Sequence, residues 1–130
     1  MDESRPDVYQ GKIIVKLVEK IKIIHENGEI NVDAKVDTGA TTSSIDVNLA
    51  KELNLGPVVE STLVKSAHGS RMRDVVEADI ELHGKPLRVK FTLAERKHMR
   101  FRALIGVNIL QEGFLVDPIM PKDFVDEKPE

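Results

Sequence analysis

The sequence contains no cysteine, and this absence excludes disulfides, thiol catalysis and a zinc site built on thiolates. Aromatic residues are also scarce, with no Trp and a single Tyr, so we do not expect a surface on which nucleobases stack. Basic residues are not in excess, because the net charge is −3, and this balance argues against nucleic acid as a partner. No apolar run approaches the length of a membrane span, so we expect a cytoplasmic location without membrane contact.

The composition that remains is typical of one globular domain. The chain has 130 residues, of which 41% are hydrophobic and 32% charged, and this length is sufficient for a hydrophobic core. Both ends are polar and contain proline. We therefore expect a single domain over residues 11–120, between a flexible N-terminal segment at 1–10 and a flexible tail at 121–130.

Alternation of apolar and polar residues predicts a mainly β fold. The clearest strand covers residues 30–36, in which every second residue is apolar, and the preceding Asn27-Gly28 is typical of a hairpin turn. Residues 76–82 and 87–93 predict a second hairpin, with acids on the outer face of one strand opposite bases on the other. Two short helices are expected, at residues 47–54 and 108–112. The pattern favours a small closed β-barrel or sandwich.

The predicted strand 30–36 leads directly into a turn that begins Asp37-Thr38-Gly39. A carboxylate at the end of a half-buried strand is held rigidly, and two carboxylates that share a proton supply an acid and a base from one residue type. Because the chain has a single Asp-Thr-Gly, such a pair requires a second copy of the chain, related by a twofold axis. A turn-forming role for Asp37 explains the tripeptide equally well.

A second element, Ala103–Leu110, has an apolar-apolar-Gly sequence before a predicted short helix. Together with Val36–Ala40, it resembles the two signature elements of the retropepsin-like aspartic proteases, which include the retroviral enzymes. The resemblance implies a closed retropepsin-like barrel with a flap hairpin, here at residues 64–75. It implies that Asp37, Thr38 and Gly39 are catalytic. It also implies a structural support for the turn, formed by Leu104, Ile105 and Gly106.

Within this superfamily, several motifs between residues 12 and 120 are similar to a microbial family labelled as ATP-dependent zinc proteases. The motifs are Lys35–Ala40, Val76–Ile80, Phe91–Arg96, Met99–Arg102 and Phe114–Pro118. That family is associated with ATP-grasp ligases that add glutamate tails to proteins, so the resemblance implies trimming of acidic or polyglutamate peptides. The position after Gly39-Ala40 is often basic in the family and is Thr41 here. If this position contacts substrate, the substrate specificity of this chain differs from that of the family.

The residues themselves do not support the zinc and ATP parts of that label. There is no His-Glu-x-x-His motif and no glycine-rich loop that would hold a phosphate. Catalytic zinc requires three convergent ligands, but the four histidines are scattered over predicted turns and loops. They are His25, His68, His83 and His98. We therefore expect neither a metal nor another cofactor.

Candidates for substrate contact lie in the Asp37 turn, at the flap and in a basic segment before Leu104. They are Ala40 and Thr41 in the turn, Ser66, Ala67, His68, Gly69 and Arg71 in the flap, and Arg100 and Arg102 in the basic segment. Arg binds carboxylates in bidentate fashion, so the basic segment 96–102 is a candidate clamp for an acidic substrate. A solvated charged loop is the alternative interpretation of this segment.

These features lead to one main hypothesis and two alternatives. The main hypothesis is an aspartic endopeptidase, active as a homodimer, in which two Asp37 side chains share a proton and activate water while the flap excludes bulk solvent. The first alternative is a non-catalytic dimeric module that binds acidic peptides on the same scaffold. The second is a metal-dependent hydrolase.

Overall fold

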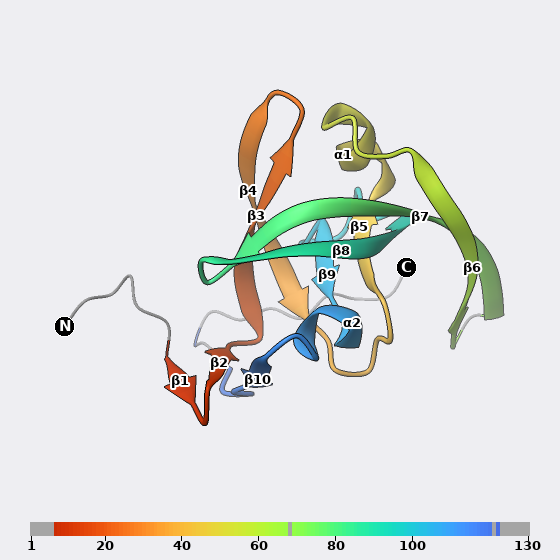
Figure 1. Cartoon of the computed structure of the whole chain (residues 1–130). Helices are drawn as coiled ribbons and strands as arrows, with labels where there is room; N and C mark the ends of the chain where they lie inside the picture. Colours follow the sequence, from red (N-terminus) through yellow and green to blue (C-terminus); the bar gives the residue numbers. More distant parts are fainter. Residues whose placement is uncertain (1–6, 68, 121, 123–130) are drawn as a thin grey trace.

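The computed structural model describes residues 7–67, 69–120 and 122, and these residues form two β-sheets and two short helices (Figure 1). The strands are β1 (Val8–Tyr9), β2 (Lys12–Val15), β3 (Val18–His25), β4 (Gly28–Val36), β5 (Ser43–Asp46), β6 (Val58–Ser66), β7 (Gly69–Leu82), β8 (Lys85–Ala94), β9 (Ala103–Ile105) and β10 (Phe114–Val116). The helices are α1 (Val47–Glu52) and α2 (Val107–Leu110). The predicted candidate His68 lies outside the described residues, as do residues 1–6, 121 and 123–130 of the two expected tails.

Six strands of the larger sheet close into a barrel. Their order is β3-β4-β9-β5-β8-β7, and β3 pairs with β7 as well, from Ile21 opposite Leu82 to Ile24 opposite Asp79. Closure removes most of the sheet edges that would otherwise be open to other chains. The predicted fold class, a mainly β closed barrel with two short helices, is confirmed.

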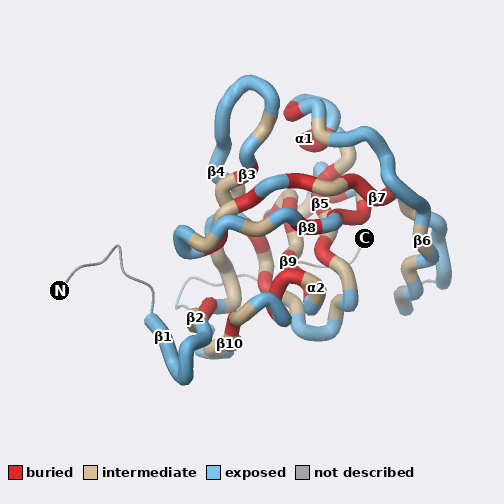
Figure 2. The backbone as a smooth tube through the Cα atoms, in the orientation of Figure 1, coloured by how far each residue is buried: buried red, intermediate tan, exposed pale blue. Residues whose placement is uncertain are grey.

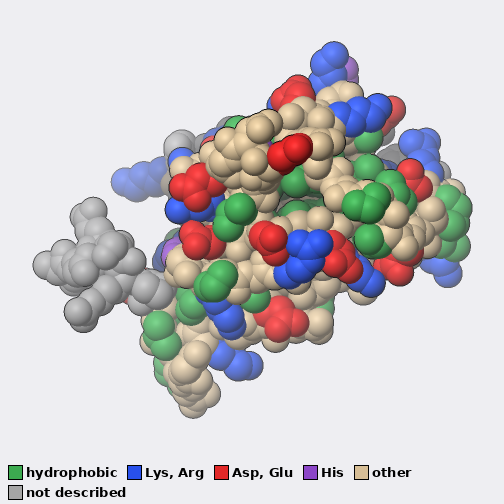
Figure 3. Space-filling model, turned by 45° about the horizontal axis from the view of Figure 1, so that its top comes forward, with side chains coloured by type: hydrophobic (Ala, Val, Ile, Leu, Met, Phe, Trp, Pro, Cys, Tyr) green, Lys and Arg blue, Asp and Glu red, His purple; other side chains and the backbone are tan. Residues whose placement is uncertain are grey.

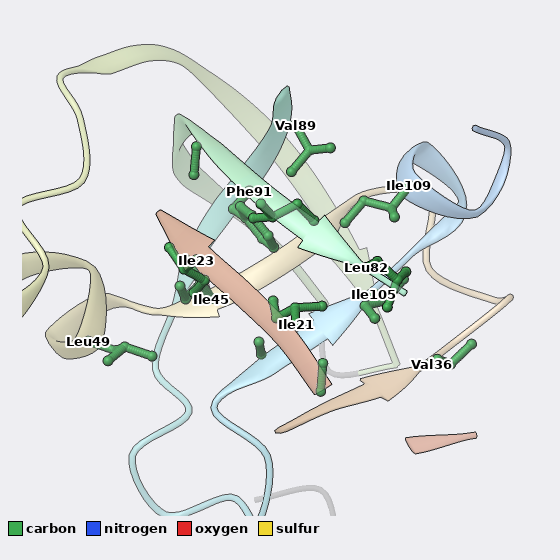
Figure 4. Close-up of a cluster of buried hydrophobic side chains, with 14 of the residues drawn as sticks. Ile21, Ile23, Val36, Ile45, Leu49, Leu82, Val89, Phe91, Ile105 and Ile109 are labelled. Carbon is green, nitrogen blue, oxygen red and sulfur yellow. The ribbon is translucent and has the colours of Figure 1, made fainter. Parts of the chain in front are cut away.

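The barrel is filled by the apolar side chains that alternate along its strands. Ile21 and Ile23 of β3 are fully buried, and Phe91 of β8 and Ile105 of β9 meet them in the interior (Figure 4). Burial of each large side chain is worth about 1.5–3 kcal/mol. The β3–β4 hairpin extends beyond this core, and its tip is exposed (Figure 2). The interior therefore ends below the Asn27-Gly28 turn.

The strand β6 pairs with the first half of β7 and forms an arm that extends from the barrel (Figure 1). Pairing runs from Val58 opposite Val76 to Ser66 opposite Gly69, with an irregularity near Val58. Most of the arm is exposed (Figure 2). The predicted flap at residues 64–75 corresponds to the outer part of this arm.

The second predicted hairpin forms as expected between β7 and β8. Glu77 lies opposite Lys90 and Asp79 lies opposite Arg88. The Arg88 guanidinium contacts Glu77 at 3.1 Å and Asp79 at 3.2 Å. Exposed pairs of this kind contribute little to stability, so their main effect is to fix the register of the two strands.

A small second sheet joins the two ends of the described chain. Its central strand β2 pairs antiparallel with β1 and parallel with β10. Lys16, just after β2, binds Asp117 at 2.9 Å. The division into one domain and two flexible tails stays a prediction. Within the described residues, no helix is long and apolar enough to cross a membrane.

The N-cap residue of α1, Asp46, is fully buried. Its carboxylate accepts hydrogen bonds from the backbone N–H of Arg96 at 2.9 Å and of Leu49 at 3.2 Å, and from the guanidinium of Arg102 at 2.7 Å. Burial by itself raises the pKa of Asp46. The hydrogen bonds from Arg102 and the two amides together lower it by more than burial raises it, so the pKa lies below its usual value. One carboxylate thus connects β5, α1 and the segment between β8 and β9.

Replacing Asp46 with Asn is expected to lower the free energy of unfolding at neutral pH by about 2–3 kcal/mol. The Asn side chain keeps one acceptor oxygen, but its NH2 group replaces the other oxygen and faces groups that are themselves hydrogen-bond donors. Because the folded pKa lies below the unfolded value of about 3.9, the stabilisation is present above about pH 4 and is lost as the pH falls through the folded pKa. Urea unfolding at pH 7 and pH 3 measures both effects. The exposed Asp79→Asn is the control, with an expected change below about 0.5 kcal/mol, and an Asp46 variant as stable as this control would contradict the prediction.

Candidate active site

Asp37 is the first residue after β4, and backbone hydrogen bonds fix it on both sides. Its N–H donates to the carbonyl of Ile105 at 2.9 Å, which continues the parallel pairing of β4 with β9. Its carbonyl accepts from the N–H of Ala40 at 3.2 Å, which closes the turn. The carboxylate Oδ1 accepts from the N–H of Gly39 at 2.9 Å. A Cβ at Gly39 would lie only 3.2 Å from that oxygen, so glycine allows this close approach.

The segment from β9 to α2 lies directly against the turn. The N–H of Val107 donates to the carbonyl of Ala40 at 2.8 Å, and the N–H of Asn108 donates to that of Thr41 at 3.1 Å. Gly106 is so close that an added Cβ would lie 2.8 Å from the Ala40 oxygen and 2.8 Å from a backbone carbon of Thr42. The structure thus places Gly106 beneath the turn, Ile105 in the core and Leu104 in the wall of a cleft.

A polar bridge between Ser43 and Asn108 was not predicted from the sequence. The N–H and hydroxyl of Ser43 donate to Asn108 Oδ1 at 2.8 and 2.7 Å, and the Ser43 hydroxyl accepts from the N–H of Gly106 at 2.8 Å. Asn108 Nδ2 donates to the carbonyl of Lys90 at 2.9 Å. The two side chains lock the end of the turn to α2 and β8. The signal in the sequence was an Asn two residues after Gly106, at the start of a short helix.

A cleft of about 650 Å³ opens beside Asp37. One wall is the turn with Gly39, Ala40 and Thr41, and another is β6 over residues 62–65. The arm therefore lies beside the candidate catalytic carboxylate, as expected for a flap. Charged side chains of both signs are intermixed over the molecular face in Figure 3, so that face carries no broad patch of one sign.

The structure brings together some of the predicted site residues and separates others. Those that line the cleft with Asp37 are Gly39, Ala40, Thr41 and Leu104. Thr38 is exposed on the turn, and Ala67 and Gly69 are exposed at the arm's tip, where the side chain of Ser66 is not described. Arg71 lines a neighbouring groove of about 280 Å³.

The two predicted arginines of the basic segment lie elsewhere. Arg100 lies over the Phe101 ring, 5.2 Å from its centre, and Arg102 binds the buried Asp46. Neither is among the residues that line the cleft or the groove. Their assignment to substrate binding stays a prediction, without support from their position.

Three other cations line the cleft, and one of them belongs to the basic segment 96–102. They are Lys65 of β6, Arg73 of β7 and Arg96 after β8. Arg96 is almost fully buried, and its Nε donates to the carbonyl of Phe101 at 2.9 Å. Burial, together with the like charges of Arg71 and Arg96, lowers the pKa of Arg73. Strand alternation contained a signal for Arg73, because it shares a face with the buried Val75 two residues later.

Comparison with solved structures identifies the class of fold. The EIAV protease in complex with the inhibitor HBY-793 has a TM-score of 0.62 at 18% identity, over 82% of this chain and 93% of that one. The simian foamy virus protease has a TM-score of 0.53 at 15% identity, over 72% of this chain and 91% of that one. The protein Lpg0085 of Legionella pneumophila, whose function is unknown, has a TM-score of 0.58 at 25% identity, over 81% and 92%. The fold is therefore retropepsin-like.

The sequence comparisons narrow this class to a family. The family described as RimB-like, retropepsin-like aspartic endopeptidase RimB, matches residues 47–128, and the chain belongs to this family. The match begins ten residues after Asp37 and so does not include the turn. The resemblance to retropepsin-like proteases that the sequence indicated is confirmed.

A curated relative also matches part of this chain. A probable alpha-L-glutamate ligase of Desulfotalea psychrophila is 27% identical over 114 residues, with 68% of this chain and 25% of the relative aligned. The chain thus spans about a quarter of the length of that relative. In the described part of the chain, no three His, Asp or Glu side chains lie where they would hold one metal ion.

Proposed function

We propose that this protein is an aspartic peptidase, active as a homodimer in which two Asp37 side chains share one proton. The observation that carries the proposal is the position of Asp37. Backbone hydrogen bonds fix this residue at the end of β4, and it lines the cleft beside the arm. Membership of the RimB-like family supports the same chemistry. Each chain supplies one such carboxylate, so the site is incomplete without a second copy.

The chemistry follows from one proton shared between two like carboxylates. The ionised Asp37 takes a proton from a water molecule, and the water oxygen attacks the carbonyl carbon of the scissile bond. The protonated Asp37 donates its proton to the carbonyl oxygen in the same step. The tetrahedral intermediate then collapses: the C–N bond breaks, the leaving nitrogen takes up the proton held by the first carboxylate, and one hydroxyl of the intermediate returns its proton to the second carboxylate as the new C=O bond forms. The N–H of Gly39 stabilises Asp37 while it is charged.

We propose acidic peptides as the substrate class. The cleft has three cationic side chains and only one carboxylate, Asp37, among its described lining residues. The similarity to a probable glutamate ligase agrees with a substrate rich in glutamate. The cytoplasmic location expected from the sequence stays a prediction.

Hydrolysis of a glutamate-rich peptide between pH 3 and pH 8, in the presence of a chelator, tests the proposal. We expect cleavage that the chelator does not inhibit, and a dimer in sedimentation at the assay concentration. Loss of activity on chelation, restored by metal, would instead indicate a metal-dependent hydrolase. Saturable peptide binding without any cleavage would indicate the non-catalytic binding module. A monomer at high protein concentration would contradict the paired site.

A further inference from the structure

The charge within the cleft differs from that of the whole chain. The protein carries a net charge of −3, yet Lys65, Arg73 and Arg96 bring three positive charges to a cleft whose only described carboxylate is Asp37. A hollow lined by charge of one sign focuses its field and raises the local concentration of oppositely charged ligands. The cleft is therefore electrostatically suited to an anionic ligand.

Arg73 holds the central position among these cations. It lies in β7 opposite Thr62, near the middle of the arm, and it lines both the cleft and the adjoining groove that contains Arg71. Arg73 and Ala94 are shared by the two linings, so a peptide that passes from the cleft into the groove lies next to Arg73. Its Nη1 donates to the carbonyl of Leu93 at a long 3.4 Å, and among the described residues no carboxylate lies within 4 Å of its guanidinium.

The surroundings of Arg73 favour an incoming anion. Burial and the like charges of Arg71 and Arg96 lower the pKa of Arg73, and the attraction of Glu95 in the groove only partly opposes them. A guanidinium stays charged under these conditions, so the repulsion is present in the unliganded protein. A bound carboxylate would relieve the repulsion and accept two parallel hydrogen bonds from the planar guanidinium.

We propose that Arg73 is the specificity-determining residue of the cleft and binds a carboxylate side chain of the peptide, with Arg96 adding positive charge behind it. This inference rests on the proposed function and names the part of the site that selects acidic substrates. Arg73 does not touch the reacting atoms in this proposal. Its replacement therefore weakens selection for the carboxylate and leaves the chemistry at Asp37 unchanged.

Two matched peptides test the assignment: a glutamate-rich peptide, and the same peptide with each glutamate replaced by glutamine. They are assayed at a pH above about 5, where free glutamate side chains are ionised. We expect the wild type to prefer the glutamate peptide in kcat/KM by about tenfold to a hundredfold. Arg73→Gln should abolish most of this preference through a higher KM for the glutamate peptide with little change in kcat, and Arg73→Lys should keep part of it.

Lys51→Gln is the matched control, because it removes one exposed positive charge of α1 outside the described lining of the cleft. It should leave the preference unchanged. An equal preference in wild type and Arg73→Gln, or no preference in wild type, would overturn the assignment. If the wild type cleaves neither peptide, the proposed peptidase function fails, and the dissociation constants of the same peptides decide about Arg73. A glutamate preference in binding that Arg73→Gln removes supports the assignment, and one that persists overturns it.

Discussion

Replacing Asp37 with Asn is expected to lower kcat/KM for peptide hydrolysis by at least about a thousandfold, because the amide can neither take a proton from water nor hold the shared one. The fold should be retained. Asp37 is only partly buried, and the Asn side-chain oxygen can still accept from the N–H of Gly39. The free energy of unfolding should change by less than about 1 kcal/mol. Peptide hydrolysis and urea unfolding of the same preparation measure the two quantities.

Mixtures of wild-type and Asp37→Asn subunits then show whether the site is shared. If equal amounts exchange at random, about a quarter of the dimers contain two intact carboxylates, so activity per total protein falls to about a quarter. If each chain acts alone, half of the activity remains. Asp33→Asn, which removes an exposed carboxylate from the same strand, is the control and should retain wild-type activity. Activity near wild type in the Asp37 variant would exclude the paired-aspartate mechanism.

Much of the barrel could be predicted because strand alternation is a local property. The alternation along 76–82 and 87–93 identified the faces of β7 and β8, and the observed register places acids opposite bases as expected. Closure could not be predicted in this way. The pairing of Ile21 with Leu82 joins residues far apart in the sequence, and alternation specifies which face of a strand is buried without specifying its partner.

The same limit explains what the sequence missed in the site. Arg100 and Arg102 belong to a basic cluster in the sequence, but such a cluster does not show which carboxylate each side chain contacts. Arg102 meets Asp46, 56 positions earlier in the chain. Arg73 comes from the arm and lines the same cleft as the Asp37 turn. The Asp37 turn and its glycine support could be predicted because their chemistry lies in two contiguous motifs, whereas the cationic lining depends on tertiary contacts.

Replacing Gly106 with Ala is expected to reduce both stability and activity. The backbone of Gly106 is extended, with φ −102° and ψ −172°, so alanine meets no conformational penalty there. Its Cβ, however, would lie 2.8 Å from the Ala40 oxygen and 2.8 Å from a Thr42 backbone carbon. Overpacking against backbone costs about 1–3 kcal/mol. Relief requires the turn to move away from α2, which displaces Asp37 and should lower kcat by about tenfold to a hundredfold.

A second glycine separates this local effect from a general loss of stability. Gly28, at the tip of the β3–β4 hairpin, has φ +137° and no atom within 4 Å of an added Cβ, so Gly28→Ala introduces backbone strain without a clash. It should destabilise the protein by about 1–3 kcal/mol and leave kcat unchanged. Equal losses of kcat in the two variants would show that activity follows stability alone. A loss of kcat confined to Gly106→Ala would show that the position of the turn, held by the segment from β9 to α2, sets the rate at Asp37.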